Sequence, residues 1–114
     1  MATIPAFASV AETGEAPPTA TAHVLDFLQH YPAVAQLLQE AEGPLRTAFG
    51  PEVTLSLAIE LDPEIPSWEH LVAAIHTIGS AEDAQARLQA FDDAWWREQT
   101  PRAQAKLLFD LIVV

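Results

Sequence analysis

Residues 53–61 read VTLSLAIEL, and apolar and more polar side chains alternate strictly along the whole stretch. Because successive side chains of a β-strand point to opposite faces, the odd-numbered positions share one face and the even-numbered positions share the other. The apolar face consists of Val53, Leu55, Leu57, Ile59 and Leu61. The stretch therefore predicts a strand with one buried face and one face in a more polar environment.

The next segment, residues 68–78, fits two interpretations. As a helix it has an apolar stripe that Gly79 could close, and as a strand it places Leu71, Ala73 and Ile75 on one face. The prolines of residues 62–66 indicate a turn or loop before it. Since a lone strand leaves its edges unpaired, we predict a second strand that pairs with the first as a hairpin.

Helical patterns flank this hairpin. Apolar residues recur at helical spacing from Ala22 to Phe49, and Pro32 fits the first turn of a new helix within that run. A further helix is predicted to begin at Ser80 with a capping box and to end at Thr100–Pro101. Leu107–Val114 resembles a final strand that is apolar on both faces, which indicates burial on both sides or a dimer contact.

These elements follow the order helix, strand, strand, helix, strand. They predict an α+β fold, with a three-stranded, mainly antiparallel sheet covered by two helices on one face. We expect the first strand to lie in the centre, beside both others. Residues 22–114 form this single domain, and residues 1–21, which contain Pro5, Pro17 and Pro18 and no sustained period, are expected to form a flexible N-terminal extension.

The composition excludes several classes of protein. The chain has no cysteine, so disulfides, thiolate metal sites and a cysteine nucleophile are excluded. Sixteen acidic residues face five Lys and Arg, for a formal net charge of −11. Because the five bases form no run, direct binding of nucleic acid is not expected. The acidic balance fits a basic protein partner, mimicry of DNA, or simple solubility.

Nothing in the sequence predicts contact with a membrane. No apolar stretch approaches the ~20 residues that span a bilayer. Met1–Val10 lacks the Lys or Arg that begins a secretory signal. We therefore expect a cytoplasmic protein.

The four histidines do not predict a metal site. His23 and His30 are seven residues apart and His70 and His76 are six apart, and neither spacing lets one helix face hold one ion. The four glycines are isolated, so no phosphate-binding loop is present, and no nucleophile motif can be recognised. We expect no catalytic residue, no metal and no cofactor.

Two short segments are candidates for binding a partner. Asp62, Glu64 and Glu69 cluster around the predicted hairpin loop, where they either form a solvated acidic loop or contact a basic partner. Asp92 and Trp96 lie near the end of the predicted helix. Trp96 lies about 100° beyond the apolar stripe, a position typical of a binding hot spot when exposed, although the ring could instead pack beneath the helix end.

About 60% of the chain, from about Leu45 onward, resembles a family of small prokaryotic proteins without an established activity. The likeness depends on short motifs that include Asp62-Pro63-Glu64, Ser80 with Glu82, Phe91-Asp92, Trp95-Trp96, Pro101-Arg102-Ala103, Lys106-Leu107 and the apolar C-terminal strand. The resemblance implies a strand at Leu71–Thr77. It also implies a place in small regulatory modules of the toxin–antitoxin kind.

Our first functional hypothesis is a non-catalytic acidic interaction module, such as an antitoxin-like or accessory subunit, that binds a protein partner and could dimerise through the last strand. A small enzyme or ligand-binding domain is the alternative, in which carboxylates of residues 60–69 act with His70 or His76. That alternative requires these groups to converge in a concave pocket. A DNA mimic is the third hypothesis, and it predicts competition with DNA for a basic protein.

Overall fold

The computed structural model describes residues 4–10, 17–62, 64–65 and 68–113. Parts of the predicted extension, Pro63 and Pro66 of the predicted loop, and Val114 lie outside the described residues. The elements, in chain order, are β1 (Ala8–Val10), α1 (Pro17–His30), α2 (Pro32–Phe49), β2 (Thr54–Leu61), β3 (Glu69–Thr77), α3 (Ala81–Phe91), the π-helix η1 (Asp92–Trp96), α4 (Arg97–Ala103) and β4 (Leu107–Val113). The fold is α+β, as predicted.

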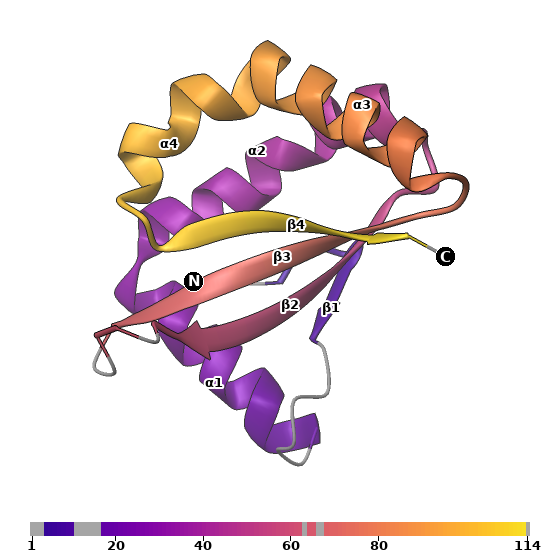
Figure 1. Cartoon of the computed structure of the whole chain (residues 1–114). Coiled ribbons are helices and arrows are strands. Elements are labelled where there is room, and N and C mark those ends of the chain that lie inside the picture. Colours follow the sequence, from indigo (N-terminus) through magenta and orange to yellow (C-terminus); the bar gives the residue numbers. More distant parts are fainter. Residues whose placement is uncertain (1–3, 11–16, 63, 66–67, 114) are drawn as a thin grey trace.

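The strands form one sheet in the order β1-β2-β3-β4. The predicted hairpin is confirmed, because β2 and β3 pair antiparallel with Leu57 opposite Ala73. The prediction of three mainly antiparallel strands is wrong in detail, since β1 pairs parallel to β2 and β4 pairs parallel to β3. The predicted place of the first strand beside both others is also wrong, since β2 lies between β1 and β3 and the last strand lies beside β3 (Figure 1).

The additional strand comes from the segment that the sequence pattern assigns to an extension. Ala8 and Val10 pair with Leu55 and Leu57, and Phe7 is buried in the core. A strand of three residues is too short to show a period, so its pairing with β2 is a tertiary effect that local sequence does not announce. Helix α1 likewise begins at Pro17, before the predicted start at Ala22.

Local signals explain where the helices begin. Pro32 occupies the first turn of α2, as predicted, where its missing N–H would have no partner in the helix. The Ser80 hydroxyl accepts a hydrogen bond from the backbone N–H of Asp83 at 3.0 Å, which confirms the predicted cap of α3. η1 joins α3 and α4 into one continuous helical segment, which continues past Pro101 to Ala103 instead of ending at Thr100.

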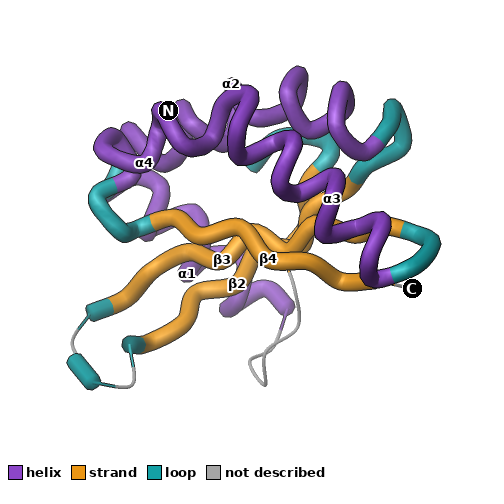
Figure 2. Tube along the Cα trace, turned by 45° about the horizontal axis from the view of Figure 1, so that its top comes forward, coloured by secondary structure: helices purple, strands orange, loops and turns teal. Residues whose placement is uncertain are grey.

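The helices lie on one side of the sheet. Figure 2 shows α2, α3 and α4 above the strands, and in Figure 1 the strands pass in front of α1 and α2. The core lies between these layers and includes Leu28, Leu38, Leu57, Ile75 and Phe91. No helix among the described residues is long and apolar enough to cross a membrane.

We call the other side of the sheet the open face. By strand register it carries Thr54, Ser56, Ala58, Glu60, His70, Val72, Ala74, His76, Leu108, Asp110 and Ile112. Leu108 and Ile112 are 45% and 41% exposed. The predicted burial of β4 on both sides is therefore wrong for the described structure, because its core face is covered by helices and its open face is not.

Candidate functional site

The outer edge of β4 is the first component of the candidate site. The N–H of Leu71 in β3 donates to the carbonyl of Lys106 at 2.8 Å. In a parallel ladder, alternate residues turn their backbone groups to the same side, so Leu108, Asp110 and Ile112 face β3. The intervening residues of β4 turn their N–H and C=O groups outward. Among the described residues the sheet order ends at β4, so this edge is open to a further strand.

Asp110 lies on this edge and partly blocks it. Its carboxylate accepts a hydrogen bond from the outward backbone N–H of Leu111 at 2.8 Å. Charged side chains and satisfied amides are common ways in which natural sheets protect an edge from uncontrolled pairing. The edge is therefore available, but a strand that pairs with it must displace or accommodate a negative charge.

A groove runs between this edge and the helical segment above it. Its lining is Gln85, Leu88, Gln89, Asp92, Trp96 and Phe109, and it encloses about 220 Å³. Leu88, Trp96 and Phe109 provide an apolar floor, because all three are partly buried side chains packed against the core. The polar members come from one stripe of α3 and η1, so the groove has an apolar bottom and a polar helical wall.

Trp96 and Asp92, both predicted from the sequence, belong to this groove. The rings of Trp96 and Phe109 meet edge to face, with centroids 4.7 Å apart, and Trp95 lies 6.0 Å from Trp96. The wider turn of a π-helix is frequent at functional sites and here lets both tryptophans pack on the core. Trp96 is thus packed on the core and still lines a surface groove, and its part in binding stays a prediction.

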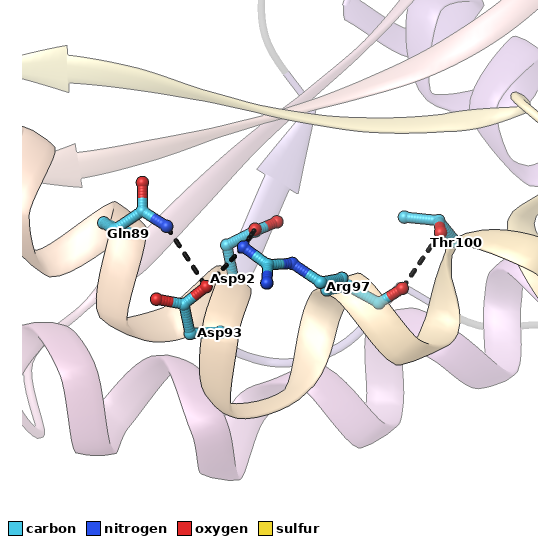
Figure 3. A network of polar contacts seen from close by, with 5 residues as sticks. All are labelled: Gln89, Asp92, Asp93, Arg97 and Thr100. Atoms are coloured by element: carbon cyan, nitrogen blue, oxygen red, sulfur yellow. Dashed lines mark hydrogen bonds and ion pairs between the residues drawn. The ribbon is translucent and has the colours of Figure 1, made fainter.

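Two carboxylates, those of Asp92 and Asp93, contact the Arg97 guanidinium (Figure 3). Because Asp92 and Gln89 also line the groove, this network lies at its rim. Arg97 contacts Asp93 at 2.5 Å and Asp92 at 3.4 Å, and Gln89 donates to Asp93 at 3.1 Å. The Thr100 hydroxyl donates to the Arg97 carbonyl at 3.0 Å. Two carboxylates against one base leave a net negative charge at this end of the groove.

Every basic side chain of the protein is engaged within the fold. Four arginines form ion pairs: Arg46 with Glu42, Arg87 with Asp83, Arg97 with Asp92 and Asp93, and Arg102 with Glu40. The hydrogen bond from Arg102 lowers the pKa of Glu40 and raises the pKa of Arg102 itself. Lys106, the fifth base, is buried. The surface therefore presents an excess of carboxylates without a compensating basic patch.

The predicted acidic loop supports its own turn. The Asp62 carboxylate accepts hydrogen bonds from the backbone N–H groups of Glu64 and Ile65 at 2.8 and 3.0 Å, the arrangement of an Asx turn. Glu64 is exposed. Asp62 is thus committed to local structure, whereas Glu64 is accessible to a partner.

Glu69, the third predicted loop residue, lies on the helical side of the sheet. Its carboxylate lies 2.8 Å from Nε2 of His23 in α1. Its backbone carbonyl accepts a hydrogen bond from Lys106 Nζ at 2.8 Å. Lys106 Nζ also lies 3.6 Å from the centroid of Trp68 and 4.8 Å from that of Tyr31. This cluster joins α1, β3 and the start of β4, and sequence reasoning missed it because its members are far apart in the chain.

The structure brings together only some groups of the alternative enzyme hypothesis. His76 pairs with Ser56 on the open face at 2.5 Å, whereas His70 lies opposite Glu60 at the other end of the same two strands. The Glu69 carboxylate lies on the opposite side of the sheet, beside His23. Within the described ranges, no group of three or more His, Asp or Glu is placed to hold a metal ion.

The five predicted partner residues therefore separate into two sets. Asp62, Glu64 and Glu69 lie at the β2–β3 turn and the beginning of β3, and Asp92 and Trp96 lie beside β4. No protein-family model, curated protein or solved structure matches this chain.

Proposed function

We propose that this protein is a non-catalytic interaction module that binds a basic protein partner through β4. The observation that carries the proposal is the combination of a free strand edge with exposed apolar side chains on the same strand. Leu108 and Ile112 are each exposed by more than a third, on the open face of the sheet, which no helix of the described residues covers. Apolar side chains that gather on one strand, rather than singly, are typical of a contact surface.

The charge of the protein supports a basic partner. Because all five bases are engaged within the fold, an approaching molecule meets a field dominated by carboxylates. Such a field raises the rate of encounter with a basic protein and opposes an acidic one. An antitoxin-like or accessory subunit is one instance of such a module, and a partner that also binds DNA would fit the DNA-mimic hypothesis.

Pairing of β4 with β4 of a second copy would use the same edge. This homodimer is a separate prediction of the apolar last strand, and sedimentation velocity over a range of concentrations tests it. A dimer that dissociates when Ile112 is replaced by Glu would support the homodimer in place of a foreign partner.

Site-specific photocrosslinking tests the proposed function directly. A photoreactive amino acid is introduced at Leu108 or Ile112, and for comparison at Glu98, an exposed residue of α4 that does not line the groove. In the native host, we expect positions 108 and 112 to capture the same basic protein and position 98 not to capture it. Equal capture from all three positions, or no capture from a monomeric protein, would refute the proposal.

A further inference from the structure

The geometry around β4 specifies more than a patch of surface. On the outer edge, the backbone groups of alternate residues point outward, as the bond from Leu71 to Lys106 requires. On the core side of that edge lies the groove that includes Leu88, Trp96 and Phe109. On the other side lie Leu108 and Ile112 with Asp110 between them. An edge strand beside a helix-walled groove is the arrangement that accepts an extended peptide as an additional strand.

We propose that β4 binds an extended segment of the partner as a fifth strand, with apolar side chains alternating with Lys or Arg. This inference rests on the proposed function and deepens it, because it assigns both the mode of binding and the chemical class of the ligand. Backbone hydrogen bonds to the outward groups of β4 hold the segment. The two flanks of the edge select its side chains.

Alternation follows from the different chemistry of the two flanks. Successive side chains of the added strand point to opposite faces of the sheet. Those on the helical side enter the groove over Trp96 and Phe109, where an apolar side chain fits. Those on the other side lie beside the exposed carboxylate of Asp110, where a Lys or Arg fits. Asp92 and Asp93 share one arginine, so their excess negative charge favours a further Lys or Arg of the bound segment at the rim of the groove.

A second copy of this chain fits the edge less well than a basic segment. Antiparallel pairing of two β4 strands around their middle would bring the two Asp110 carboxylates together on one face, between two molecules that each carry a net charge of −11. Like charges that lie opposite each other destabilise a strand pair. A basic segment turns the same carboxylate into a favourable contact when it displaces Asp110 from the Leu111 N–H.

Selection from a library of random linear peptides displayed on phage tests the inference on the full chain. We expect the enriched peptides to alternate apolar and basic residues, and a synthetic peptide with the enriched sequence then gives the affinity by fluorescence anisotropy. Asp110→Lys should weaken binding by about tenfold or more. Glu98→Lys makes the same change of charge on α4, outside the groove, and should change the affinity by less than about twofold.

Backbone pairing is tested separately from charge. Val113→Pro removes an outward N–H without removing a bond to β3, so it should weaken peptide binding, and it should do so more than Val113→Ala, which keeps that N–H. If Asp110→Lys does not fold, the comparison of Val113→Pro with Val113→Ala still tests whether the peptide binds as an added strand. N-methylation of every second residue of the peptide should abolish binding when it removes the N–H groups that face β4. The same modification of the intervening residues should leave binding intact.

Several results would overturn the inference. These are failure to enrich any peptide, equal weakening by Asp110→Lys and Glu98→Lys, or no response to N-methylation and to Val113→Pro. If photocrosslinking from positions 108 and 112 nevertheless captures a basic protein, the interaction module stands and only strand addition fails. If crosslinking fails as well, the proposed function fails with it.

Discussion

Replacement of Lys106 by Met tests whether the buried base stabilises the junction of α1, β3 and β4. Lys106 is 7% exposed, and its Nζ donates to the Glu69 carbonyl at 2.8 Å. The same atom lies 3.6 Å from the centroid of the Trp68 ring. Methionine keeps most of the apolar stem of lysine and fills irregular space well, so Lys106→Met removes the charge with little change in packing.

The expected magnitude follows from these contacts. A hydrogen bond from a charged group contributes about 1.5–3 kcal/mol, and a desolvated cation over an aromatic ring about 2 kcal/mol. Removal of the base also removes the cost of burying it, which offsets part of this loss. We expect Lys106→Met to lower the free energy of unfolding by about 1–3 kcal/mol, since the Glu69 carbonyl loses its donor.

Urea denaturation followed by tryptophan fluorescence measures the change. Arg46→Met is the matched control, because it removes a base of an exposed i,i+4 ion pair and should cost only ~0.3–0.5 kcal/mol. A double-mutant cycle with Trp68→Leu should give a coupling energy of about 0.5 kcal/mol or more. If Lys106→Met is neutral or stabilising, desolvation outweighs the contacts and the reasoning is refuted.

Three further predictions concern stability. Phe91→Ala, in a fully buried position against the Phe109 ring, should lower the free energy of unfolding by about 3–5 kcal/mol in urea, and a loss below that range would show that the core collapses around the gap. Ser80→Ala should cost ~1 kcal/mol because α3 loses its cap, whereas Ser80→Thr, measured in the same way, should retain most of it. Because the hydrogen bond from Arg102 makes the pKa of Glu40 lower in the folded than in the unfolded protein, the pair stabilises the fold at neutral pH and loses this effect as the pH falls through the folded pKa. Glu40→Gln should therefore reduce stability at neutral pH and not below both pKa values, and an equal loss at both pH values would contradict the assignment.

The central hairpin was predictable because its signals are local or follow from a general need for pairing. The alternation from Val53 to Leu61 identified β2 directly. Residues 68–78 fitted helix and strand equally well by period, and the need of β2 for a neighbour decided correctly for β3. Ser80 and Pro32 identified helix starts because capping and proline geometry depend on a few neighbouring residues.

The arrangement around that hairpin was not predictable. β1 has three residues and depends on its pairing with β2, so no pattern in the local sequence predicts this strand. The position of β4 beside β3 follows from where the α3–η1–α4 segment returns the chain, which depends on packing against α2 and not on local sequence. The mainly antiparallel sheet was wrong for these two reasons.

The candidate site was predicted in part. Asp92 and Trp96 were recognised from their place near the end of the predicted helix, and they do line a groove. The partner of that groove, Phe109, was invisible to sequence reasoning because it lies on another strand, as was the burial of Lys106 between Tyr31 and Trp68. Outward alternation of backbone groups along β4 could have been found only once its pairing with β3 was known.

The short strand β1 has a consequence for motion. Three residues in register with β2 form the shortest pairing in the sheet, and closing that pair requires the whole α1–α2 connection to be in place. Amide protons of β1 should therefore exchange with solvent sooner than those of β2 and β3, because the β1–β2 pair can open by itself. β1 would then detach and pair again while the hairpin at the centre stays closed.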